Sequence, residues 1–344
     1  MSIDIFTTRA MSAALRQDKK ANRFLLDLLF GRVEMSNAEY IDIDIVKGKR
    51  RIAPFVAPVV EGKAVESRGF TTNSYKPAYI KQKFATSADE ILNNRSAGEA
   101  VYAMGTPAQR AAAKLAEELA DHEDMVSRRE EWMAAQALTS GKVSVVGEGI
   151  NQVVDFQLDA THNVTLTGTD LWTDQTNSDP LSDLRTWIKL VLKDSGINPN
   201  VFIAGTDVIE ALVNHPKVKD LLDTRRVDMG MIDPMELAPG VAYYGTLKSN
   251  GVTLDVYSYD EWYVDDNGDE QPMIPAGKFI LTSTKADFRR HYGAIKDLKA
   301  GLMAMPRFVK SWENEDPSVR YVLMQSAPLP APHQIDAVLT GKAV

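Results

Sequence analysis

From Tyr40 onwards, apolar and polar residues alternate along the chain with a period of two. Ile41, Ile43 and Ile45 alternate with two aspartates, which is the pattern of a strand with one buried face. Paired aspartates are also used for metal binding and for acid–base chemistry. Here they share the face of a strand opposite the isoleucines, so we interpret them as a solvated or subunit-facing edge.

A second strand-like run follows within the next forty residues. A basic turn occupies residues 47–51, and a stretch over residues 66–84 interleaves aromatic and lysine side chains after a turn at Arg68-Gly69. Together with the first strand, this run predicts a long β-arm over residues 40–85. Because an isolated two-stranded hairpin is marginal in water, we expect the aromatic residues of the arm to need a partner surface.

The longest helix is predicted from Pro107 to Ser140. Thr106 is a favourable N-cap, proline is favoured at the first helical position, and Gly141 stands where a helix often ends. At about 1.5 Å per residue this helix would measure about 50 Å. Its apolar stripe has the spacing of one helical face and consists of Ala112, Leu115, Leu119, Val126, Met133 and Ala137.

The remainder of the chain alternates between strands and helices. Strands are predicted over residues 143–167, and an α/β region over residues 178–296 contains a short buried strand at Val201–Ala204. Thr206 is predicted to cap a helix over residues 207–214. Residues after about 297 return to apolar strands interrupted by prolines.

Composition excludes several classes of protein. The chain has 344 residues, of which 44% are hydrophobic and 25% charged, as in soluble globular proteins, and its length suggests two domains. It has no cysteine, so disulfides, thiolate metal sites and a thiol nucleophile are excluded. The N-terminus lacks a secretory signal, and no apolar run approaches the ~18 residues of a membrane span.

The formal net charge is −8 at pH 7. Proteins that bind DNA without sequence preference usually carry a basic excess, because they neutralise phosphates. This acidic balance indicates colloidal solubility, and it also fits a container wall that does not bind its contents.

Three motifs with catalytic or metal-binding associations fail on inspection. His122 begins a zinc-protease-like pattern, but Val126 replaces the second histidine. Residues 147–149 match the start of a dinucleotide-binding fingerprint. They lie in a turn between two predicted strands, whereas the fingerprint joins a strand to a helix. The acidic run at residues 265–270 contains Asn-Gly and predicts a hairpin tip. We therefore predict no catalytic, cofactor-binding or metal-binding residues, although carboxylates brought together by the fold leave an enzyme as an alternative.

Several stretches resemble the lambda-type phage major capsid proteins, the major capsid protein E family. They fall in one order over nearly the whole chain: Ser67-Arg68-Gly69, Pro77-Ala78-Tyr79-Ile80-Lys81, Leu222-Asp223-Thr224-Arg225-Arg226, Tyr292-Gly293-Ala294-Ile295 and Met324-Gln325-Ser326-Ala327-Pro328-Leu329. One departure is Phe70, which stands where a second glycine is expected. Phe70 cannot adopt left-handed backbone conformations as readily as glycine, so the tip of the loop is expected to differ in shape.

The resemblance implies an α+β chain with the Hong Kong 97-type phage capsid fold. It implies an N-terminal arm (1–39), an extended β-loop (40–85), a peripheral domain (86–177) with a spine helix (107–140), an axial domain (178–296) and a return to the peripheral domain (297–344). The apolar cluster Phe24–Phe30 predicts either a helix docked on the core or an arm anchored on a neighbouring subunit. The resemblance favours the arm.

By the same resemblance, the chain is a structural major capsid (head) protein and not an enzyme. Its implied partners are copies of itself in pentamers and hexamers, a scaffolding protein, a portal and, in some relatives, a decoration protein. The icosahedral shell would be assembled in the host cytoplasm and would enclose phage DNA without sequence-specific binding, with no membrane and no cofactor. An encapsulin-like shell around protein cargo is the alternative within the same fold.

Charged and aromatic residues of the arm and of one loop are the candidate subunit contacts. Arginine suits carboxylate recognition across an interface, although two adjacent arginines can equally be solvated or paired locally. The candidates are Arg68, Gly69, Phe70, Tyr75, Lys81, Lys83, Arg225 and Arg226.

Overall fold

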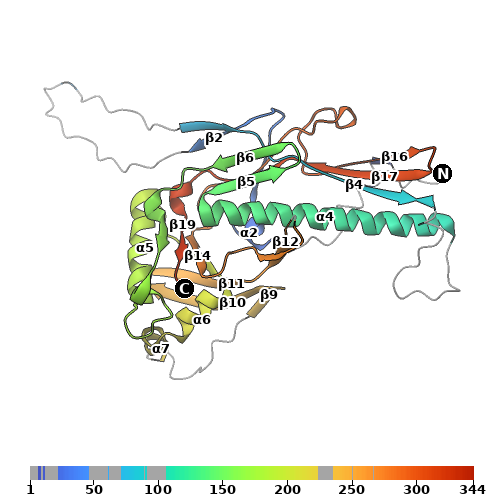
Figure 1. Cartoon of the computed structure of the whole chain (residues 1–344). Helices are drawn as coiled ribbons and strands as arrows, with labels where there is room; N and C mark the ends of the chain where they lie inside the picture. Colours follow the sequence, from blue (N-terminus) through green and yellow to red (C-terminus); the bar gives the residue numbers. More distant parts are fainter. Residues whose placement is uncertain are drawn as a thin grey trace.

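The computed structural model describes residues 7–8, 11, 22–45, 61, 71–88, 90, 106–223, 235–249, 251–265 and 267–344. In these residues helices and strands are mixed, as the α+β prediction requires (Figure 1). The helices are α2 (Phe24–Leu28), α4 (Pro107–Ser140), α5 (Pro180–Ser195), α6 (Thr206–Asn214) and α7 (Pro216–Asp223).

Helix α4 runs along the molecule and connects its two ends (Figure 1). Its first turn is closed by a capping box, in which the Gln109 backbone N–H donates to the Thr106 hydroxyl at 3.3 Å and the Thr106 N–H donates to the Gln109 side chain at 2.8 Å. The helix ends at Gly141, whose φ of 68° is left-handed and favours glycine. Both predicted ends of this helix are confirmed.

A seven-stranded sheet forms the larger body of the molecule. Its strand order is β7-β19-β14-β8-β11-β10-β9. Its strands are β7 (Asn163–Thr165), β8 (Val201–Ala204), β9 (Met235–Ala238), β10 (Val241–Ser249), β11 (Val252–Tyr259), β14 (Lys278–Thr282) and β19 (Leu339–Lys342).

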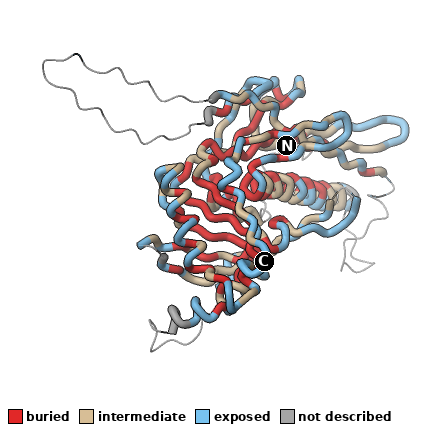
Figure 2. The backbone as a smooth tube through the Cα atoms, turned by 60° about the vertical axis from the view of Figure 1, so that its left-hand side comes forward, coloured by how far each residue is buried: buried red, intermediate tan, exposed pale blue. Residues whose placement is uncertain are grey.

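The two faces of this sheet belong to different hydrophobic clusters. Ile203 and Ile280 face the C-terminal part of α4, whereas Phe202 and Phe279 face α5 and α6. The alternation follows from the period of two in a strand. Because both faces are covered, β8 is buried throughout, as Figure 2 illustrates for the red strands of the sheet.

A second, three-stranded sheet lies beside the N-terminal part of α4. Its order is β16-β17-β4, with β4 (Ile80–Ser87), β16 (Phe308–Asn314) and β17 (Val319–Ser326). Another three-stranded sheet has the order β1-β15-β18, with β1 (Arg32–Met35), β15 (Phe288–Tyr292) and β18 (Pro328–Pro332).

Three hairpins complete the described strands. They pair β2 (Ile41–Ile45) with β3 (Thr71–Tyr75), β5 (Lys142–Gly147) with β6 (Ile150–Asp155), and β12 (Trp262–Val264) with β13 (Glu270–Pro272). The turn predicted at residues 147–149 and the hairpin predicted around the acidic run are therefore confirmed.

The predicted cap at Thr206 is wrong. Helix α6 already begins at this residue, with Gly205 as the N-cap and without a side-chain cap. The Thr206 N–H instead donates to the Asp260 carboxylate at 3.0 Å, and its hydroxyl donates to the same carboxylate. Asp260, which is distant in the sequence, thus accepts hydrogen bonds from the first residue of the helix. Thr206 does not act as the capping acceptor that the sequence predicted.

Strand pairing crosses two of the predicted domain boundaries. β7 and β19 join the seven-stranded sheet although they lie outside residues 178–296, while β15 lies inside this range and pairs with β1 and β18. β14 pairs with β8 along one edge, so the backbone N–H and C=O groups on its other edge also need partners, and β19 supplies them. Sheet membership does not follow these boundaries, and the division into peripheral and axial domains stays a prediction.

Candidate assembly surfaces

The β16-β17-β4 sheet presents a basic and aromatic face on the side away from α4. Residues paired across antiparallel strands share a face, and Leu323 pairs with Lys83 on one side and Lys310 on the other. Lys81 and Lys83 are exposed. The Lys83 Nζ lies 4.7 Å from the centroid of the Tyr321 ring, a cation–π geometry.

The same face continues onto β16. Trp312 is 38% exposed and stacks on Tyr321 with 5.3 Å between ring centroids. The Lys310 Nζ lies 5.7 Å from the Trp312 ring and forms an ion pair with Asp297. We call Lys81, Lys83, Lys310, Trp312 and Tyr321 the outer sheet face.

The opposite face of this sheet packs on α4 through an apolar cluster and through several polar contacts. His122 lies 3.1 Å from the Gln82 side-chain oxygen, and its ring centroid is 4.1 Å from that of Phe84. The Thr86 hydroxyl donates to Glu118. Burial lowers the pKa of His122 and raises the pKa of Glu118. His122 is thus a packing residue of the helix.

The aromatic residues at the base of the arm pack on their own chain. The Tyr75 ring lies 5.8 Å from that of Phe156. The Tyr79 hydroxyl donates to Gln325, and Phe84 contacts the helix as described. The partner surface expected for these three aromatic residues is therefore supplied by distant segments of the same chain. A contact of Tyr75 with another subunit stays a prediction.

The remaining candidate residues lie outside the described part of the chain: Arg68, Gly69, Phe70, Arg225 and Arg226. The β2–β3 hairpin is a described part of the predicted β-arm, and its register runs from Ile41 opposite Tyr75 to Ile45 opposite Thr71. Asp42 is exposed, which agrees with the interpretation of a solvated edge. Figure 1 shows this hairpin at the edge of the molecule, next to β6.

The apolar cluster before Gly31 docks on the core of its own chain. Leu25 and Leu26 of α2 are fully buried, and their backbone N–H groups donate to the Glu131 carboxylate of α4 at 2.7 and 3.1 Å. The Tyr259 hydroxyl donates to the same carboxylate at 3.0 Å. Burial raises the pKa of Glu131 to about 7 despite these donors. The favoured anchoring of this cluster on a neighbour is therefore wrong.

A buried ion-pair network connects α4 with the segment before β16. The Arg307 guanidinium donates to Glu123 at 2.7 Å and to Glu130 at 2.6 Å, and the Tyr292 hydroxyl donates to Glu130 at 3.2 Å. Burial works against the charge of Arg307, but Glu130 and Glu123 outweigh it and raise the pKa of this arginine. Sequence reasoning missed the network because its members are far apart along the chain.

A loop before β16 exposes apolar side chains. Leu298 is 89% exposed, Leu302 54% and Met303 56%. Contiguous exposed apolar groups often mark interaction surfaces. The sequence analysis did not single out this loop, although the apolar residues beside Gly301 were a usable signal.

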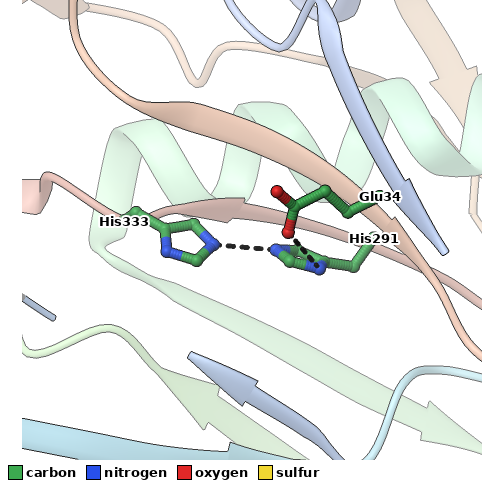
Figure 3. A group of neighbouring side chains, drawn as sticks. All are labelled: Glu34, His291 and His333. Carbon is green, nitrogen blue, oxygen red and sulfur yellow. Dashed lines mark hydrogen bonds and ion pairs between the residues drawn. The ribbon is translucent and has the colours of Figure 1, made fainter. Parts of the chain in front are cut away.

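Two histidines and a glutamate also converge in the β1-β15-β18 sheet region. Glu34, His291 and His333 each offer one ligand atom within 4.8 Å of the others (Figure 3). Burial and the neighbouring His333 lower the pKa of His291 to about 4, so its ring is neutral at pH 7. No local motif indicated this group, because its members come from three distant segments.

Within the part of the chain that the structure describes, no helix has the length and apolar composition needed to span a membrane.

Comparison with known proteins agrees with this architecture. Residues 7–343 match the family described as phage major capsid protein E. The chain is 29% identical over 334 residues to the major capsid protein of Enterobacteria phage P21, covering 94% of this chain and 95% of that protein. It is 29% identical over 336 residues to the major capsid protein of Escherichia phage lambda, covering 95% and 96%.

Solved structures show the same fold. A capsid protein from a prophage of Escherichia coli CFT073 superposes with a TM-score of 0.74 at 22% identity, with 100% of both chains covered. A phage-related protein of Bordetella bronchiseptica gives a TM-score of 0.56 at 16% identity, with 97% and 96% covered. The Hong Kong 97-type fold is thus confirmed, and the chain belongs to the phage major capsid protein E family, the structural proteins of phage heads.

Proposed function

We propose that copies of this chain assemble, as pentamers and hexamers, into a closed icosahedral shell that encloses phage DNA. The observation that carries the proposal is the family match, which extends over residues 7–343. The role is mechanical and not catalytic. It is supported by the exposed basic and aromatic side chains of the outer sheet face and by the β2–β3 hairpin at the edge of the molecule.

In this proposal the outer sheet face meets acidic surface on a neighbouring subunit. Lys81 and Lys83 are exposed on a chain whose formal net charge is −8, so another copy of the chain offers complementary charge. Such pairs set register and specificity more than affinity. Stability of the shell then comes from many modest interfaces acting together, arranged head to tail around five- and six-fold axes.

The further partners follow from the same role. A scaffolding protein directs assembly in the host cytoplasm, a portal occupies one vertex, and a decoration protein is an additional component in some heads. The acidic balance of the chain supports a wall that encloses DNA without sequence-specific binding, because phosphate contacts need basic residues.

The first experiment is electron microscopy with light scattering on the full chain, expressed alone and together with the scaffold gene of its own phage or prophage. We expect closed shells or capsomer rings. Particles from infected or induced cells should contain DNA, whereas a defined protein cargo would favour an encapsulin-like shell. A persistent monomer in the presence of the scaffold would contradict the proposal.

The outer sheet face is tested by the double variant Lys81→Glu/Lys83→Glu. Reversing two charges should abolish closed shells and leave a folded subunit, since both side chains are exposed. Lys189→Glu on α5 is the matched control, because this lysine is also exposed and lies on a different element. Circular dichroism reports the fold, and electron microscopy the shells. Unchanged shell yield in the double variant would remove this face from the proposal.

A deletion that tests the β-arm must spare Tyr75 and Tyr79. Tyr75 and Tyr79 belong to contacts within the subunit, so removing them would damage the fold itself. Deleting residues 62–70 leaves β3 intact and removes Arg68, Gly69 and Phe70. We expect a folded subunit that forms no shells. Shells of normal yield from this variant would show that the arm is dispensable.

A further inference from the structure

Three side chains with metal-binding chemistry meet where β1, β15 and the end of β18 come together. Glu34 of β1 lies directly opposite His291 of β15 in the parallel register, and His333 follows the last residue of β18. The two Nε2 atoms of the histidines are 2.8 Å apart, and the Glu34 Oε2 lies 3.7 Å from the His291 Nδ1. Figure 3 shows the three side chains pointing toward one another.

Neighbouring charged side chains bind one carboxylate oxygen of Glu34 and leave the other oxygen available to bind an ion. Glu34 Oε1 forms ion pairs with Arg289 Nη1 at 2.8 Å and with Arg32 Nε at 3.5 Å, whereas Oε2 faces His291. Arg289 is itself held by Asp287, with 2.7 Å between Nε and Oδ1. Partners of this kind orient metal ligands and tune their basicity.

We propose that Glu34, His291 and His333 form a binding site for a divalent transition-metal ion of the zinc class. Two imidazole nitrogens and one carboxylate oxygen are a ligand set that Zn²⁺ accepts, with a fourth position for water. The Glu34 side chain is 33% exposed, so solvent reaches that position. Both histidines are buried, which limits the motion of the rings and fixes two of the ligands.

The two histidine rings must move slightly apart to admit an ion. With Zn–N bonds of about 2.0–2.1 Å in a tetrahedral site, two ligand nitrogens are about 3.3 Å apart, so the rings must separate by about half an ångström. The positive charges of Arg32 and Arg289 balance the negative charges of Glu34 and Asp287. Coordination and not net negative charge therefore supplies the affinity, and we expect a dissociation constant in the micromolar range.

The ion would connect three segments that are distant in the sequence. β1 belongs to the N-terminal segment, whereas β15 and the residue after β18 belong to the C-terminal third of the chain. Because an ion that binds only the folded state stabilises it by mass action, zinc should strengthen the attachment of the N-terminal segment to the core.

The test is calorimetric titration of Zn²⁺ into the full chain, prepared without a histidine tag and treated first with a chelator. We expect one site per chain and a rise in melting temperature on zinc addition. Co²⁺ should give the visible absorption of a tetrahedral site. His333→Gln should abolish saturable binding, and Glu34→Gln should weaken it at least about tenfold.

His162→Gln is the matched control, because His162 is also buried and lies 3.1 Å from a carboxylate of Asp194 in another part of the fold. This variant should bind zinc as the native chain does. Absence of a micromolar site in the native chain would overturn the proposal and leave a simple hydrogen-bonded histidine pair. Unchanged binding in Glu34→Gln would overturn the three-ligand assignment. Neither result bears on shell formation, which is measured separately.

Discussion

The body around the seven-stranded sheet and the extension around the β16-β17-β4 sheet are stabilised in different ways. In the body, the rings of Trp172, Trp187, Phe202 and Phe279 stack in one buried cluster, with centroids 4.5 to 6.2 Å apart. Helices and strands cover both faces of the central strand β8. Such a region is complete within one subunit.

The extension has a smaller apolar cluster and more polar contacts. The cluster between its sheet and α4 consists of Met11, Leu115, Leu119, Val126, Val309, Val322 and Met324. His122 and Glu118 lie among them and bond to β4, while Trp312 and two lysines stay in solvent on the other face. The surface proposed for assembly thus lies beside the smaller of these two apolar clusters.

The largest test of this comparison is Phe279→Ala against Phe84→Ala. Phe279 is fully buried, with its ring 4.5 Å from that of Trp187, so its truncation should lower the free energy of unfolding by about 3–5 kcal/mol. Phe84 is only partly buried beside His122. Its truncation should cost less than about half as much, because fewer contacts and a smaller cavity are involved. Urea denaturation of both variants measures the difference.

Equal costs for the two variants would contradict the comparison. The same titrations provide a control, because an unchanged dependence of the unfolding free energy on urea concentration indicates that neither substitution alters the surface exposed on unfolding.

A smaller effect is expected from Glu131→Gln, which tests how α2 is attached to the body. Burial raises the pKa of Glu131 to about 7 in the folded chain from its ordinary value of 4.5. The folded state therefore binds the proton more tightly, and the stabilisation present below pH 4.5 is lost as the pH rises through about 7. The stability advantage of the native chain over the variant should shrink between pH 5 and pH 8 by more than about 1.4 kcal/mol, the value of one pKa unit.

The opposite pH dependence would have a different physical cause. The two backbone donors and the Tyr259 hydroxyl favour the ionised carboxylate, so an advantage that grows with pH would mean that these donors outweigh burial. Chemical denaturation at several pH values distinguishes the two outcomes. Glu148→Gln in the exposed β5–β6 turn is the control and should show no such trend.

Local signals in the sequence predict both ends of α4. They do not predict which side chains attach this helix to the rest of the fold. Thr106, Gln109 and Gly141 act within one turn of the helix ends, so their residue types alone predict where the helix begins and ends. Arg307 bonds to Glu130 across 177 positions, and no periodicity reports a contact of that kind. The family resemblance supplied the fold and the role, but not these contacts.

The same distinction explains other contacts that the sequence did not predict. Thr206 has the residue type of an N-cap, but its hydroxyl bonds to Asp260, 54 positions away. Tyr75 and Tyr79 look unpartnered within an isolated arm, because their partners Phe156 and Gln325 come from later segments. Alternation identifies which residues share a face of a strand, whereas only the fold shows what covers that face.

The smallest expected effect is that of Thr106→Ala, at the end of α4 that lies in the extension. The substitution removes the hydroxyl that accepts from the Gln109 N–H and should cost about 1 kcal/mol. Thr186→Ala on α5 is the matched control: its hydroxyl bonds back to the Ser182 carbonyl within the helix, so its loss should change stability by less than about 0.5 kcal/mol. Hydrogen exchange should quicken in the first turn of α4 and not in the seven-stranded sheet. Equal quickening in both would show that the helix transmits the loss into the body, and that the extension and the body open as one cooperative unit.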